Sequence, residues 1–102
     1  MYAVRTEQEK EMVDVCKFVF NEGISKEIIE EKLALAIVTA ECTFGKEKVR
    51  LNAAYLSSEN KVVIDVSSEV GEHIAQVFTG LVSRHFGEDK FSVDRVKEKK
   101  EQ

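Results

Sequence analysis

Two histidines, His73 and His85, are the side chains of this sequence best suited to acid–base or metal chemistry near neutral pH. They lie twelve positions apart on one predicted helix, too far along its axis for both to bind one metal ion. His85 falls near the predicted helix end, where a protonated imidazole suits the helix dipole. His73 follows Glu72 and has no evident catalytic partner. We therefore expect no catalytic residue and no metal site.

The two cysteines, Cys16 and Cys42, are the other candidates for chemistry. Zinc sites usually contain closely spaced cysteines, and these two are far apart in sequence. Both lie in apolar segments, so we expect buried free thiols rather than a disulfide. The sequence has no glycine-rich phosphate-binding motif, and we expect no cofactor.

Runs of carboxylates such as Glu27, Glu30 and Glu31 are typical of a solvated helix face rather than of general-acid catalysis. The sequence therefore favours a non-catalytic protein. One alternative stays open, namely a small ligand-binding or enzymatic domain whose site forms between subunits, with Tyr55 or His73 directed into it.

Basic residues form a candidate patch if the first predicted hairpin and the C-terminal segment lie together: Lys46, Lys48, Arg50, Lys90 and Arg95. Nucleic-acid-binding domains are usually strongly basic, whereas this chain has 19 acidic and 15 basic residues and a formal net charge of −4. A nucleic-acid-binding accessory protein is therefore an alternative that the sequence does not favour.

Hydrophobic periodicity predicts the elements that position these residues. A first helix is expected over about residues 7–22, with a capping box at Thr6 and Glu9 and an apolar face wider than an amphipathic helix needs. Ser25 is expected to cap a short helix that ends near Lys32. A long helix is expected from Ser67 or Ser68 to Gly87, since apolar residues recur there at helical spacing.

Alternation of apolar and polar residues predicts strands at residues 34–44, 49–55 and 62–66, with turns at 45–47 and 57–60. Residues 33–44 also fit a continuation of the preceding helix, but their β-branched side chains favour a strand. Residues 91–96 fit an edge strand, with a helix as the alternative. Residues 97–102 are expected to be a solvated tail.

The chain of 102 residues is long enough for one domain, expected over residues 1–96, and its 43% hydrophobic content is typical of a folded protein. We predict an α+β fold, in which a three-stranded antiparallel meander, with a candidate fourth edge strand, is covered by two helices. The helix–three strands–helix order is similar in outline to the double-stranded RNA-binding domain. In that family, lysines at the start of the last helix bind phosphates, whereas residues 67–72 here carry two glutamates.

Glycine and other small residues in the long helix suggest close approach by a second helix, either from a partner or from this chain. The candidate interface residues are Gly80 and Thr79 in that helix, and Phe18 and Val13 on the wide apolar face of the first helix. We expect a protein-interaction or assembly module, most simply a homodimer. No run of apolar residues is long enough to span a membrane, and residues 1–6 lack a signal-peptide pattern, so we expect a cytoplasmic location and no membrane partner.

Overall fold

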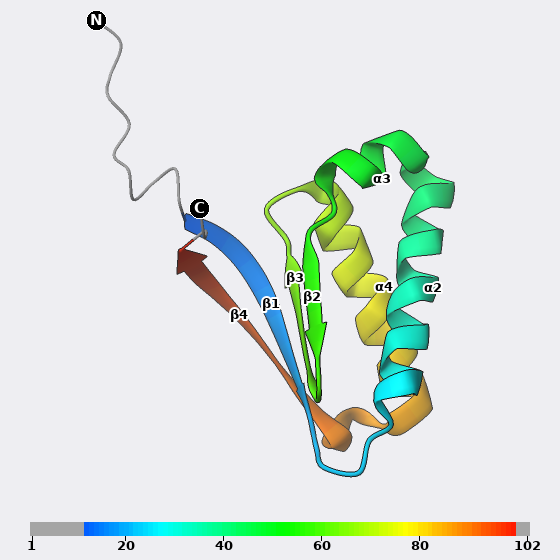
Figure 1. Ribbon diagram of the computed structural model, residues 1–102, viewed down its shortest axis with the longest axis vertical. Helices are drawn as coiled ribbons and strands as arrows, with labels where there is room; N and C mark the ends of the chain where they lie inside the picture. The colour runs from blue at the N-terminus through cyan, green and yellow to red at the C-terminus, as the bar shows by residue number, and fades with distance from the viewer. Residues whose placement is uncertain (1–11, 100–102) are drawn as a thin grey trace, which may run out of the picture.

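The computed structural model describes residues 12–99, which form an antiparallel sheet with helices packed on one side (Figure 1). In chain order the elements of this segment are β1 (Met12–Phe20), α2 (Lys26–Phe44), α3 (Lys46–Asn52), β2 (Tyr55–Ser58), β3 (Lys61–Asp65), α4 (Glu69–Phe86), a short 3-10 helix η1 (Glu88–Lys90) and β4 (Phe91–Lys99).

The sheet has the strand order β2-β3-β1-β4, and every neighbouring pair is antiparallel. The two helical crossovers, β1 to β2 and β3 to β4, each skip one strand. This connectivity is the split β-α-β, or ferredoxin-like, arrangement. Many unrelated functions occur on such a scaffold, so the topology does not identify an activity.

Aromatic side chains form the centre of the core between the sheet and its two long helices. Phe18 and Phe20 of β1 point towards the helices, and the Phe18 ring meets Phe78 of α4 edge-on with centroids 4.9 Å apart. Directly opposite residues of antiparallel strands share a face, so Val62 and Ile64 of β3 lie on the same side and are fully buried. Helix α2 adds Ile29, Leu33, Ala36 and Ala40 to this core, at helical spacing.

Helix α4 confirms the prediction for residues 69–86 at both ends. The Ser68 hydroxyl accepts a hydrogen bond from the Gly71 amide, and Gly87 follows the last turn with a positive φ of 101°. The position of Gly71 requires glycine, because a Cβ there would lie 1.8 Å from the backbone oxygen of Asp65. Helix α4 can therefore begin this close to the end of β3 only with glycine at that position.

The predicted helix over residues 7–22 is wrong for the described part, which is strand β1. Residues 7–11 and the capping box at Thr6 and Glu9 lie outside the described residues. Strand β1 is central and carries apolar side chains on both faces, so it lacks the alternation that would have identified it. Its valines and phenylalanines are strand-forming residues, and their β-propensity agrees with the structure.

The predicted strand at residues 34–44 is also wrong, because α2 continues from its Ser25 cap to Phe44. The alternative of a continuing helix is the one realised. Two threonines fit the helix because their hydroxyls donate to carbonyls one turn earlier, Thr39 to Leu35 and Thr43 to Thr39. The sequence contains neither proline nor glycine between Ile24 and Gly45 to end the helix.

Most of the strand predicted at residues 49–55 is helix α3, and only Tyr55 belongs to a strand. The apparent alternation there was misleading, since Val49 is buried whereas Leu51 is 84% exposed. The predicted turn at residues 57–60 overlaps β2, so the meander reduces to the hairpin β2–β3. The similarity in outline to the double-stranded RNA-binding domain therefore does not hold.

The predicted turn at residues 45–47 is wrong, since Lys46 and Glu47 form the first turn of α3, whereas two strand predictions agree with the structure. Strand β3 lies within a residue of the predicted 62–66, and the edge strand predicted at 91–96 is β4. Strand β4 extends to Lys99, into the segment predicted as tail, and Lys97 there donates to an Asp14 carboxylate oxygen at 2.8 Å. The α+β class, an antiparallel sheet with helices on one face, is confirmed.

Candidate interaction surfaces

The two histidines pack against phenylalanine rings. The His73 ring meets Phe44 of α2 edge-on at 5.4 Å, and its Nε2 atom is buried without a hydrogen-bond partner. The His85 ring meets Phe86 at 4.8 Å. Among residues 12–99 no cluster of three or more histidine, cysteine or acidic side chains could hold a metal ion. His73 is therefore a half-buried ring contact between two helices, and His85 is an exposed residue whose ring contacts its neighbour Phe86.

The two cysteines are free thiols in different surroundings. Cys16 of β1 is half-buried beside the core, and this burial raises the pKa of its thiol. Cys42 near the end of α2 is exposed, contrary to the expectation that both thiols are buried. The exposure of Cys42 follows from the helix, since α2 turns this residue away from the buried line through Ala36 and Ala40.

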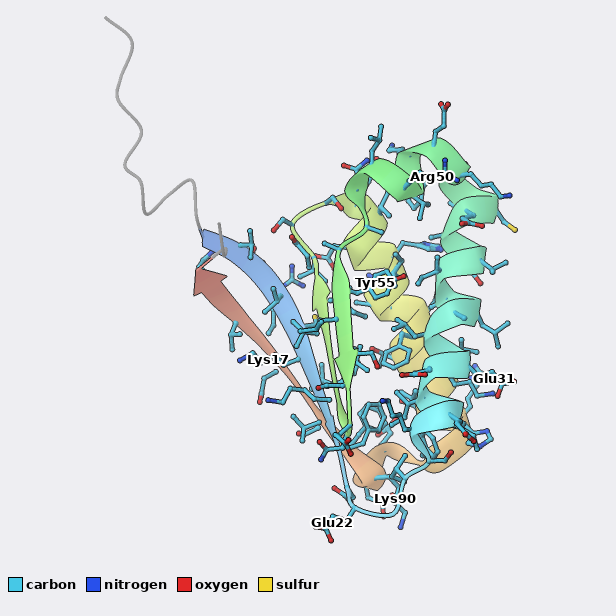
Figure 2. The ribbon with its side chains drawn as sticks, viewed as in Figure 1. Lys17, Glu22, Glu31, Arg50, Tyr55 and Lys90 are labelled. Atoms are coloured by element: carbon cyan, nitrogen blue, oxygen red, sulfur yellow. The ribbon has the colours of Figure 1, made fainter. Side chains whose placement is uncertain are left out.

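The structure brings only part of the candidate basic patch together, since Lys48 and Arg95 both pair with glutamates in the first turn of α4 whereas Lys90 lies apart. Lys46, Lys48 and Arg50 lie on α3, whereas Lys90 lies in η1 at the opposite end, and Figure 2 shows Arg50 and Lys90 far apart. Two of the cations also have acidic partners. Lys48 pairs with Glu69 at 2.7 Å, and Arg95 of β4 pairs with Glu72, a hydrogen bond that raises the pKa of the guanidinium.

The structure does not bring the candidate interface residues together either. Phe18 is fully buried in the core. Thr79 bonds through its hydroxyl to the Ala75 carbonyl within α4. Gly80 is exposed, and no heavy atom lies within 4 Å of where its Cβ would be. No other part of the described chain therefore packs closely against α4 at this glycine. Val13 lies on the side of the sheet that faces away from the helices, opposite to the side of Phe18.

The first surface of interest is the side of the sheet that faces away from the helices. Figure 1 shows both long helices packed on the opposite side. The register places odd-numbered residues of β1 and their cross-strand neighbours on it. We call this surface the outer sheet face; its aliphatic residues are Val13, Val15, Val19, Leu56, Val63 and Val96. Its charged residues, among the described side chains, are Lys17, Lys61, Asp65 and Asp94. By the same register none of the described side chains on this face is aromatic.

The free edge of β2 is the second surface. The Asp65 amide donates to the Ala54 carbonyl, so Ala54 and Asp65 form a hydrogen-bonded pair of the β2–β3 ladder. Because hydrogen-bonded and non-hydrogen-bonded pairs alternate in an antiparallel ladder, the amides and carbonyls of Tyr55 and Ser57 point away from β3. These backbone groups have no hydrogen-bond partner within residues 12–99. The Ser57 Oγ atom is buried and also lacks a partner in this part of the chain. Leu56, between them, is 67% exposed on the outer sheet face.

A groove runs between α2 and this edge. It consists of two adjacent hollows of about 260 and 250 Å³ that share Ile37 of α2 and Tyr55 of β2 in their lining. The hollow towards α3 also has Arg50 in its wall, and the other has Glu30. Tyr55 is 50% exposed above the groove (Figure 2). Glu41 lines the same hollow as Arg50, so the groove is not divided into a positive and a negative end.

Comparison with known proteins gives no relative: no protein-family model matches the chain, and neither does any curated protein or solved structure. Within the described residues, no helix combines the length and the apolar character that crossing a membrane requires. The function must therefore be argued from the surfaces themselves. Neither the outer sheet face nor the β2 edge was predicted from the sequence, because both depend on the strand order.

Proposed function

We propose that this chain is a non-catalytic assembly module that associates with further copies of itself. The observation that supports this proposal is the aliphatic outer sheet face. Antiparallel sheets with one solvated face normally carry polar side chains on it. Here the register assigns six aliphatic side chains to that face, of which Val19 and Leu56 are exposed, Val13, Val63 and Val96 are half-buried and Val15 is buried, and no helix within residues 12–99 covers it. Apolar surface of this kind typically marks an interaction site.

The charges on the outer sheet face favour a second copy as the partner. Lys17 and Lys61 are balanced by Asp65 and Asp94, so the described side chains of this face have no net charge. A nearly neutral apolar face with both signs of charge is suited to an equivalent face, in which each lysine can approach an aspartate of the partner. Two-fold dimers are also the commonest oligomers.

A nucleic-acid partner has less support. Nucleic-acid binding on an open four-stranded sheet relies on aromatic side chains that stack on bases. The described part of the outer sheet face has none, and two of the candidate basic residues, Lys48 and Arg95, are paired with glutamates of α4.

Light scattering after gel filtration, over a range of concentrations and at low and moderate salt, tests the proposal. The wild-type chain is expected to elute as a dimer or higher oligomer at both salt concentrations. A V63K variant places a charge on the outer sheet face and is expected to reduce the mass. The matched control is V38K, since Val38 lies on α2 and is 51% exposed on the helical side. A wild-type monomer at every concentration would refute self-association.

A further inference from the structure

We propose that two copies of this chain pair along their β2 edges, antiparallel about a two-fold axis at Leu56, and so join their sheets into one continuous sheet. This inference rests on the proposed self-association and adds a second contact between copies, along the sheet edge, together with its register. The first reason is the contrast between the two edges of the sheet. The other edge strand, β4, carries the charged residues Asp94, Arg95 and Lys97.

Charged side chains on an edge strand discourage pairing with another chain. Strand β2, with the sequence Tyr-Leu-Ser-Ser, has no charged residue and no proline. Its outward backbone groups at Tyr55 and Ser57 have no partner within residues 12–99. Of the two edges, β2 is therefore the one that is open to strand addition.

The spacing of the free backbone groups determines the register. Tyr55 and Ser57 are separated by one residue, so a second antiparallel β2 can form reciprocal hydrogen bonds in which Tyr55 of one copy pairs with Ser57 of the other. Leu56 then lies directly opposite Leu56 of the second copy, in the non-hydrogen-bonded position where side chains are closest. The pairing would cover the most exposed aliphatic side chain of the sheet with an identical one.

Disulfide trapping tests the register directly. Opposite residues in a non-hydrogen-bonded antiparallel pair have Cα atoms about 4.5 Å apart, within the range that a disulfide bridges. In a C42S background, L56C is expected to convert most of the protein to a covalent dimer under mild oxidation. The control is L51C, which lies on α3 and is the more exposed position at 84%. Equal cross-linking of the two variants would overturn the β2–β2 pairing.

A charge exchange provides an independent test. L56E and L56K each place two like charges opposite each other on the axis, and each is expected to have a lower solution mass than the wild type while its circular dichroism is unchanged. An equimolar mixture is expected to recover the wild-type mass, because Glu and Lys then face each other. If the wild type associates but mixing restores nothing and L56C does not cross-link, the edge pairing is wrong and self-association stands. A wild-type chain that is monomeric would refute both the edge pairing and the proposed self-association.

Discussion

Two glycines of the same helix provide the sharpest test of the packing. In the substitution Gly71→Ala, the new Cβ would lie 1.8 Å from the Asp65 backbone oxygen and 3.2 Å from the Val66 Cα. An ordinary C···O contact is about 3.3 Å or longer, so the start of α4 must move away from β3 by about 1.5 Å. In Gly80→Ala, no heavy atom lies within 4 Å of the new Cβ.

The two substitutions should therefore change the free energy of unfolding in opposite directions. Alanine gains about 0.5–1 kcal/mol over glycine in a helix interior, and Gly80→Ala is expected to stabilise by that amount. Overpacking costs about 1–3 kcal/mol or more, and the obstacle at Gly71 is backbone that cannot rotate away. Gly71→Ala is therefore expected to destabilise by about 2 kcal/mol.

Thermal and urea denaturation, followed by circular dichroism at one protein concentration, measures both effects. About 1 kcal/mol corresponds to about 4–8 °C in a domain of this size, so the two melting temperatures should differ by more than 10 °C. A Gly71→Ala variant as stable as the wild type would refute the close approach of α4 to β3. Light scattering of Gly80→Ala also tests the sequence-based interface prediction, because an alanine within a helix contact at this notch would lower the mass.

Three further predictions concern side chains of the sheet and core. The hydrogen bond from Lys97, aided by its charge, lowers the pKa of Asp14, so the stabilisation is present above the unfolded pKa of about 3.9 and is lost as the pH falls through the lower folded value. Urea titrations from pH 2 to 7 should therefore show a smaller loss of stability on acidification in D14N than in the wild type. In native protein, Cys42 should react with a thiol reagent rapidly and Cys16 slowly, since Cys16 is half-buried and its pKa is raised; a C42S variant that keeps the fast phase would contradict this. Phe78→Ala should cost about 3–5 kcal/mol in urea unfolding, because the ring is fully buried, and a loss below 1 kcal/mol would show that the core is not centred on it.

The elements that the sequence predicted correctly are those with local signals. Helix α4 has a serine cap, an apolar stripe at helical spacing and a glycine at its end, and each of these is readable within a few residues. The Ser25 cap of α2 was identified for the same reason. The end of α2 was misplaced because β-branched residues from Ile37 onwards suggested a strand, whereas helix packing against the sheet overrides that weak preference.

The surfaces could not be predicted, because they depend on contacts between distant segments. Strand β2 is an edge only because β3 pairs with β1 on its other side, a pairing that joins residues more than 40 positions apart. The four residues of β2 were assigned in part to a turn, since Ser57 and Ser58 are typical turn residues. Only the hairpin register reveals that Leu56 lies on the outer sheet face and that Tyr55 lies above the groove.

The incorrect prediction of β1 and the proposed self-association have one physical cause. Had the outer sheet face been a fully solvated surface, β1 would carry polar residues at alternate positions and its period of two would have been plain. Instead, Val13, Val15 and Val19 alternate with Cys16, Phe18 and Phe20, so both faces of the strand are apolar and the period is lost. Helices α2 and α4 account for burial on one face only. No helix of the described chain covers the valines on the other face, where Val19 is exposed, Val13 is half-buried and Val15 is buried. An apolar face without a helix over it is the pattern expected of a strand whose second layer is supplied by another copy.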